Sequence, residues 1–131
     1  SNFKNNGTIF VNSKTFPGPL NTVSVTSLTE TGANTSIWMS EAVNAEPAVN
    51  GNEALHTAAF YTSSFVGDIV VQATLDNQVT DSSNWADIRT VTLDGTEAAP
   101  TAVNFYGVFS YIRFKTTANP ANKITQILVR N

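Results

Sequence analysis

The segment DIVVQATLDN at residues 68–77 decides the fold of this chain, and four similar segments follow it. Ile69, Val71, Ala73 and Leu75 share one face of this segment, and the residues between them share the other. A period of two is typical of a half-buried β-strand. The later segments are ADIRTVTLDG at 86–95, AVNFYG at 102–107, SYIRFKTT at 110–117 and KITQILVRN at 123–131. Together they predict a row of short strands separated by turns.

The first half of the chain adds further strand signals at residues 8–11, 21–28 and 57–65. The total is about eight strands at the spacing of an all-β domain. No helical pattern of about 10–15 residues intervenes, which excludes parallel βαβ units and leaves an antiparallel sandwich, a jelly roll or a barrel. We predict a jelly-roll-like antiparallel β-sandwich, with residues 1–131 forming one domain.

Turn-forming residues mark the expected connections. Residues 29–36 are polar and contain a glycine, residues 66–68 read as a tight turn, and Asp94-Gly95 is a strong turn pair. Residues 41–54 lack an apolar stripe at helical spacing, so we expect a long loop there, with a short helical turn near residues 52–56. A full helix over this region is the less favoured alternative.

Composition excludes several classes of function. The chain has no cysteine, so it contains neither disulfides nor thiolate metal sites. Its net charge is −3 and its seven lysines and arginines are dispersed, so we expect no binding to nucleic acid or to a membrane. No basic segment followed by an apolar run marks a signal peptide at the start of the chain.

Residues 1–20 are expected to form an extended arm, because Pro17, Gly18 and Pro19 prevent regular structure after a short apolar stretch. Large apolar residues occur in this arm among asparagine, lysine and glycine. They are Phe3, Ile9, Phe10 and Phe16. We predict that these four side chains contact the body of the protein or a partner subunit, each contributing roughly 1.5–3 kcal/mol on burial.

No arrangement of residues in the sequence predicts catalysis. His56 is the single histidine and has no motif around it, so we expect it to face solvent or to form structural hydrogen bonds. The aspartates flank expected turns, where their side chains bond the backbone, rather than forming a catalytic pair. We therefore predict a protein that is not an enzyme, with no cofactor and no catalytic residues.

Two binding sites are weaker candidates. The loop at residues 76–84 is rich in oxygen ligands for calcium but lacks the EF-hand spacing, so we expect no metal there. Trp38 and Trp85, with the tyrosines, could form an aromatic platform for a glycan, although packing at the ends of strands explains them better.

Residues 68–131 resemble a module of tailed-bacteriophage virion proteins. The resemblance lies in Val71–Leu75, Trp85, Ile88, Thr90–Leu93, Val103–Phe105 with Gly107, the Tyr-Ile-Arg triplet at 111–113 and the ending ITQILVRN. It implies an accessory structural protein located in the virion, most simply a capsid decoration or cement protein.

The same resemblance leaves a neck or tail protein as an alternative, and a carbohydrate-binding β-sandwich is a further one. The implied partners are other virion proteins, either the major capsid protein or neck and tail proteins. A homo-oligomer or a symmetric array of copies is expected. The resemblance implies no catalytic residues.

Overall fold

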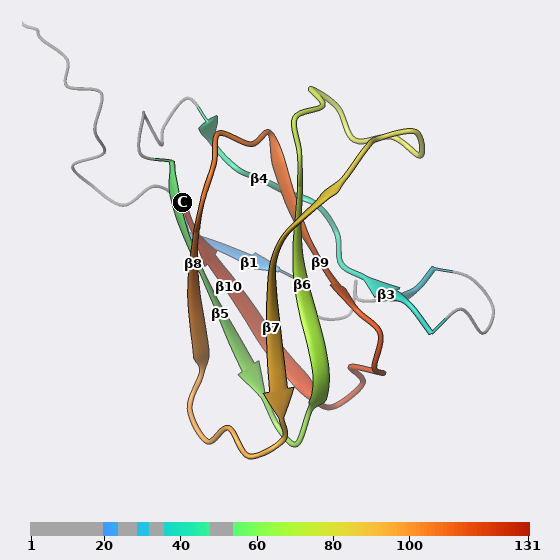
Figure 1. Cartoon of the computed structure of the whole chain (residues 1–131), viewed down its shortest axis with the longest axis vertical. Helices are drawn as coiled ribbons and strands as arrows, with labels where there is room; N and C mark the ends of the chain where they lie inside the picture. Colours follow the sequence, from blue (N-terminus) through green and yellow to red (C-terminus); the bar gives the residue numbers. More distant parts are fainter. Residues whose placement is uncertain (1–19, 24–28, 32–35, 48–53) are drawn as a thin grey trace, which may run out of the picture.

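The chain folds into antiparallel β-sheets, as the alternating segments predicted (Figure 1). This computed structural model describes residues 20–23, 29–31, 36–47 and 54–131. One sheet has four strands in the order β1 (Leu20–Val23), β10 (Ile124–Arg130), β5 (Leu55–Thr62) and β8 (Thr101–Tyr106). The other sheet has the order β2 (Thr29–Glu30), β3 (Trp38–Met39), β9 (Tyr111–Thr116), β6 (Val66–Thr74) and β7 (Ala86–Asp94), with β4 (Val43–Asn44) also pairing with β9.

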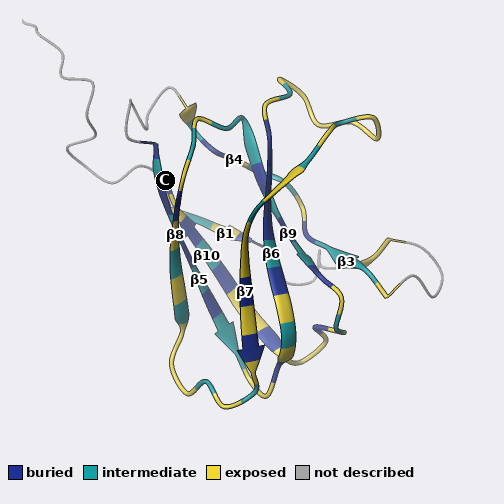
Figure 2. Cartoon of the chain, in the orientation of Figure 1, coloured by how far each residue is buried: buried dark blue, intermediate teal, exposed yellow. Residues whose placement is uncertain are grey.

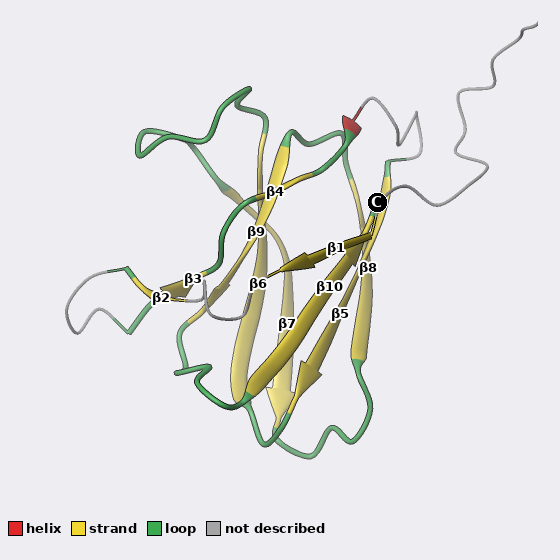
Figure 3. Cartoon of the chain, turned by 180° about the vertical axis from the view of Figure 1, so that it is seen from behind, coloured by secondary structure: helices red, strands yellow, loops and turns green. Residues whose placement is uncertain are grey.

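The two sheets pack face to face in a β-sandwich-like arrangement (Figure 3). Burial alternates along β5 and β9, which gives the banded strands of Figure 2. The inward residues form one core, and the largest fully buried apolar side chains are Phe60, Phe65, Phe114, Ile69, Ile112 and Ile127. The alternation read from the sequence is therefore confirmed for β6 at Ile69, Val71 and Ala73. Leu75 is the exception, because it lies beyond the end of β6 and is 71% exposed.

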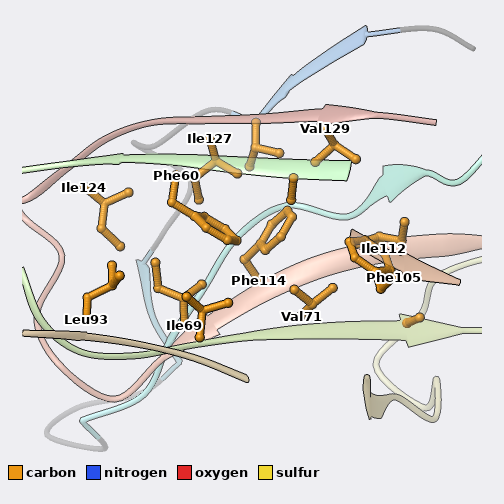
Figure 4. Close-up of a cluster of buried hydrophobic side chains, with 14 of the residues drawn as sticks. Phe60, Ile69, Val71, Leu93, Phe105, Ile112, Phe114, Ile124, Ile127 and Val129 are labelled. Atoms are coloured by element: carbon orange, nitrogen blue, oxygen red, sulfur yellow. The ribbon is translucent and has the colours of Figure 1, made fainter. Parts of the chain in front are cut away.

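Phe60 and Phe114 join the two sheets across the core (Figure 4). Phe60 comes from β5 and Phe114 from β9, and their ring centroids lie 5.5 Å apart with the planes at 82°. This edge-to-face geometry contributes about 0.5–1.5 kcal/mol beyond the burial of the two rings. Because the chain has no cysteine, such apolar contacts replace disulfides as the link between the sheets.

Ser40 fastens the segment between β3 and β4 to β9. Both short strands pair with β9, and Ser40 lies between them. The Ser40 N–H donates to Phe114 O at 2.9 Å, and the Phe114 N–H donates to Ser40 Oγ at 2.9 Å. The pairing of β3 and of β4 with β9 is interrupted at this point, and the Ser40 hydroxyl accepts the hydrogen bond of the buried Phe114 N–H there.

Arg89 links the edge strands of the two sheets. The Arg89 Nη1 donates to Asn104 O at 2.9 Å, which connects β7 to β8. The Asn104 amide oxygen also accepts a hydrogen bond from Thr57 Oγ1 at 2.7 Å. The outward carbonyl of β8 at this position is therefore already bonded to a charged side chain.

The turn predicted at residues 66–68 is wrong. Val66, Gly67 and Asp68 begin β6, and the connection from β5 falls at Ser63 and Ser64, where Ser64 has φ 58°. Gly67 marks a close approach instead of a turn, because an added Cβ would lie 2.9 Å from the Cβ of Ala118. Glycine within a strand often has this meaning.

Three other expectations need correction. Leu55 and His56 lie in β5, so the helical turn expected near residues 52–56 is wrong for these two residues, while 52 and 53 lie outside the described residues. Residues 41–54 were expected to be a loop but include the short strand β4. Residues 29–36 were expected to be a polar turn but include the short strand β2. The described residues hold ten strands, and three of them, β2, β3 and β4, were not predicted from the sequence. The expected strand at 8–11 and the arm, with Phe3, Ile9, Phe10 and Phe16, lie outside the described residues.

Replacing Phe114 by alanine tests the importance of the inter-sheet contact. The Phe114→Ala variant removes a fully buried ring and should lower the free energy of unfolding by roughly 3–5 kcal/mol. Tyr106→Ala is the control, because Tyr106 is 65% exposed and its loss should change stability by about 0.5 kcal/mol or less. Urea unfolding followed by fluorescence measures both. Equal destabilisation by the two variants would contradict this account of the core.

Candidate functional site

Two loops meet at one end of the sandwich and form the candidate site. The first connects β6 to β7, and the second connects β8 to β9 (Figure 1). The Ser110 N–H donates to Thr74 O at 2.9 Å, and Ser110 Oγ donates to Leu75 O at 3.1 Å. These two hydrogen bonds fix the second loop against the end of β6, so the two loops form one surface.

The β6–β7 loop is organised by hydrogen bonds from its own hydroxyl side chains. Ser83 Oγ accepts from Thr80 N at 2.8 Å, and Thr80 Oγ1 accepts from Ser82 N at 3.2 Å. The oxygen-rich composition that made residues 76–84 a calcium candidate is thus partly used in turn formation. Among the described residues, no group of three or more histidine, aspartate or glutamate side chains could hold a metal ion.

Trp85 separates two hollows at this end of the molecule. The first hollow has a volume of about 490 Å³. Its polar and aromatic lining comprises Thr31, Thr80, Asp81, Ser83, Trp85 and Arg113. This lining combines one carboxylate, one guanidinium, three hydroxyl groups and an indole, which are groups that orient a polar ligand.

The second hollow lies beside Trp85 and is mostly apolar. Its volume is about 370 Å³, and Leu75, Trp85 and Phe109 supply its large apolar side chains. Asp76 and Asn84 add polar groups to its lining. The half-buried indole of Trp85 is therefore shared between a polar hollow and an apolar one.

Arg113 lies over the Trp85 ring and is held there by a chain of side chains on neighbouring strands. The Arg113 Cζ is 4.1 Å from the centroid of the indole, which is a cation–π contact. The Arg113 Nε–H donates to Gln72 Oε1 at 2.8 Å, and Gln72 Nε2 donates to Asp87 Oδ1 at 2.8 Å. These contacts fix the guanidinium and the amide of Gln72 in single orientations.

The register of the sheet brings this chain of side chains together. Gln72 pairs with Arg113 in β9 on one side and with Asp87 in β7 on the other. The register shifts between Val71 and Gln72, which is a β-bulge in the pairing with β7. A bulge of this kind re-aims side chains, and here it places the Asp87 carboxylate within reach of Gln72.

The guanidinium of Arg113 has no acidic partner among the described residues. Its one hydrogen bond there is to the neutral amide of Gln72. Partial burial lowers the pKa of Arg113 from its ordinary value, although the group stays protonated at neutral pH. The positive charge is thus partly desolvated and faces the polar hollow without a counter-charge in hydrogen-bond contact.

His56 is fully buried, which agrees with the expectation of a hydrogen-bonded histidine and shows that the alternative, a histidine facing solvent, is wrong. Its Nδ1 lies 2.7 Å from Asn131 Oδ1, and its Nε2 lies 3.0 Å from Gly107 O. Asn131 Nδ2 donates to Asn44 O, so both groups facing the ring are acceptors. Either oxygen can therefore receive a hydrogen bond from an imidazole N–H.

The imidazole of His56 also stacks on two aromatic rings. Its centroid is 5.1 Å from that of Phe105 and 6.0 Å from that of Phe109, with planes inclined by 20° and 26°. Gly107 is needed at this point, because an added Cβ would lie 2.1 Å from the Phe109 ring. His56 therefore positions the β8–β9 loop that forms part of the candidate site.

The carboxylates take structural roles where hydrogen bonds are seen. Asp94 accepts from the N–H and the hydroxyl of Thr96, which lowers the pKa of Asp94, and the neighbouring Glu97 accepts from Gly95 N. This confirms the turn expected at Asp94. Asp68 differs from the prediction, because it lies in β6 and accepts from Thr92 Oγ1 across the strand pair instead of flanking a turn.

Trp38 and Trp85 do not line the same hollow. Trp38 lies in β3, is half-buried and pairs with Thr116 in the sheet register. Trp38 is absent from the linings of both hollows, whereas Trp85 belongs to both. Sequence reasoning found Trp85 but missed Arg113 and Gln72, because only the strand register reveals that they are neighbours.

Comparison of the chain with protein-family models, curated proteins and solved structures finds no match. The resemblance to phage virion proteins therefore stays a prediction. In the part of the chain that the structure describes, no helix has the length and apolar character needed to cross a membrane.

Replacing His56 by phenylalanine tests its structural role. The variant keeps a ring beside Phe105 and Phe109 but removes both ring nitrogens. Asn131 Oδ1 and Gly107 O then lose the imidazole as their hydrogen-bonding partner. The free energy of unfolding should fall by about 1–3 kcal/mol for each acceptor left unsatisfied. Thr57→Val is the control, because its hydroxyl bond is exposed. Urea unfolding that gave equal stability for His56→Phe and the unmodified chain would exclude this role.

Proposed function

We propose that this protein is a jelly-roll β-sandwich that serves as a non-enzymatic structural protein of a tailed-phage virion. Its simplest role is capsid decoration, in which repeated copies bind the head lattice, and a neck or tail position is the alternative. Jelly rolls occur both in viral capsid proteins and in lectins. The fold alone does not identify the function, so the proposal depends on the surface features described below.

The strand order supports the jelly-roll assignment. One sheet has the order β1-β10-β5-β8, and the other has the order β3-β9-β6-β7 within its longer path. Strands from the start and the end of the described chain are thus interleaved in both sheets. The six-stranded sheet contains three very short strands, β2, β3 and β4, which can be taken together as one interrupted strand. Each sheet then has four strands, and a jelly roll has eight strands in two sheets.

The observation that carries the proposal is the apolar surface at the loop end of the sandwich. Leu75 is 71% exposed and Val108 is 57% exposed, and they lie on the two loops that Ser110 joins. Val79 is also exposed, and Phe109 and Trp85 are half-buried beside them. Exposed apolar residues that gather in one region mark contact sites for other proteins.

A structural protein of a virion needs such a surface more than it needs a reactive centre. Many identical copies can each form a modest contact, and the contacts together stabilise the particle. The arm expected at residues 1–20 would add a second contact, since the chain enters the four-stranded sheet at its edge strand β1. An extended segment can bind a neighbour by adding a strand to its sheet.

The Leu75→Ser/Val108→Ser double variant tests attachment to the particle. Purified virions of the phage that carries this gene should contain the unmodified chain in many copies, measured by quantitative mass spectrometry. The double variant should be reduced at least about tenfold, because it removes two large apolar contacts. Val66→Ser is the control, because Val66 is 64% exposed at the other end of β6.

Deletion of residues 1–16 tests the arm separately and should also weaken attachment. Absence of the unmodified chain from purified virions would overturn the proposal. Normal attachment of the double variant would exclude the loop end as the contact, and normal attachment of the truncated chain would exclude the arm.

The second candidate function is the binding of glycans, and the position of Trp85 favours it. The indole lines both hollows, one of which offers hydroxyl, carboxylate and guanidinium groups. Aromatic rings combine an apolar face with a polar edge, so they suit ligands that carry both kinds of surface. Trp38 lines neither hollow and is not expected to contribute.

Tryptophan substitutions test this second function. Trp85→Ala should reduce glycan binding about fivefold or more, because an aromatic contact contributes about 1 kcal/mol, which corresponds to that change in affinity. Trp38→Ala should leave binding within about twofold of the unmodified protein. A glycan array followed by isothermal titration calorimetry of any hits measures both. An array without a hit, or equal losses in the two variants, would exclude Trp85 as a glycan-binding residue.

A further inference from the structure

We propose that the polar hollow beside Trp85 binds a carboxylate-bearing sugar, whose carboxylate is received by Arg113. This inference rests on the second candidate function, glycan binding, and specifies the class of glycan. It depends on the unpaired charge of Arg113, on the neutral residue that holds it and on the other groups that line the hollow.

The first step is the hydrogen-bonding capacity of Arg113. A guanidinium has five N–H donors, and the structure uses the one on Nε for Gln72. The four donors on the terminal nitrogens have no hydrogen-bond acceptor among the described residues, and Arg113 lines the hollow. A planar guanidinium matches a carboxylate in a two-point contact, so the open side of Arg113 suits a ligand with that group.

The second step concerns Gln72, which fixes Arg113 without neutralising it. Gln72 is 6% exposed and accepts from Arg113 while donating to Asp87. A glutamate at this position would form an ion pair with the guanidinium directly. The glutamine keeps the Asp87 carboxylate one side chain away, so Arg113 is oriented and still lacks a direct counter-ion.

The third step is the remainder of the lining, which favours a sugar over a simple anion. The exposed Asp81 carboxylate has no hydrogen-bond donor among the described residues, so it can accept hydrogen bonds from a ligand that carries donors. Phosphate would meet Arg113 and at the same time face the negative charge of Asp81. A sugar acid instead supplies hydroxyl donors for Asp81 and a carboxylate for Arg113.

The indole and the size of the hollow complete the match. The Arg113 Cζ lies 4.1 Å from the centroid of the indole that lines the same hollow. The part of the Trp85 ring that the guanidinium leaves uncovered can contact the C–H groups of a pyranose ring. The volume of about 490 Å³ lies within the 300–1,000 Å³ that is typical of small-molecule sites. One or two sugar units fit such a space.

The experiment compares acidic saccharides with their neutral counterparts. The probes are short saccharides that carry glucuronate, galacturonate or sialate, each paired with its carboxyl methyl ester, which keeps the shape but removes the charge. Isothermal titration calorimetry and NMR chemical-shift mapping measure binding to the full chain. We expect at least one acid to bind at least about tenfold more tightly than its ester, because hydrogen bonds to charged groups contribute about 1.5–3 kcal/mol.

Three variants connect the preference to the site. Arg113→Gln and Gln72→Glu should each lower the affinity for the acid at least about tenfold and bring it close to that for the ester. Gln72→Glu is the sharper test, since it leaves Arg113 in place and supplies a competing carboxylate. Arg89→Gln is the control, because Arg89 bonds the Asn104 carbonyl and does not line the hollow. NMR spectra of each variant confirm that it is folded.

The outcomes separate this inference from the function on which it rests. If acids and esters bind equally well and Trp85→Ala weakens both, the proposed glycan binding stands but the role of Arg113 is overturned. Binding of inorganic phosphate as tight as that of the acids would replace the sugar site by a simple anion site. Binding of no member of the panel to the unmodified protein would overturn the inference, and the glycan array decides the broader function.

Discussion

The contact between Phe60 and Phe114 is the interaction on which the rest of the structure depends. One ring comes from each sheet, and they meet in a core that has no disulfide to supplement it. Because Phe114 lies in the middle of β9, the same strand also receives Ser40 and the short strands β3 and β4. Loss of packing at this point would therefore affect both the sandwich and the segment that covers its edge.

The candidate site lies on the outer face of the same strands. Arg113 is flanked in sequence by Ile112 and Phe114, which are both fully buried, and Gln72 is flanked by the buried Val71 and Ala73. In a strand, successive side chains point to opposite faces. The inward residues thus fix the backbone positions from which Arg113 and Gln72 project.

The sequence predicted which residues of each strand face inward better than it predicted which residues of adjacent strands contact each other. The alternation at Ile69, Val71, Ile112 and Phe114 was sufficient to predict an all-β fold with an inward apolar face, and the structure confirms it. The contact of Gln72 with Arg113 was not predictable, because it joins residues 41 positions apart and depends on strand register. The turn predicted at residues 66–68 was wrong, because a glycine in a sequence is equally compatible with a turn and with a close approach inside a strand, as at Gly67.

Arg89 has a consequence for how many neighbours this fold can accept along the four-stranded sheet. That sheet ends in β1 on one side and β8 on the other, and the guanidinium of Arg89 occupies the Asn104 carbonyl on the β8 side. Charged groups at a sheet edge discourage the addition of another strand. A strand added at the β8 edge would have to displace this guanidinium from the carbonyl, so the contact limits the neighbours that this side of the sheet can accept.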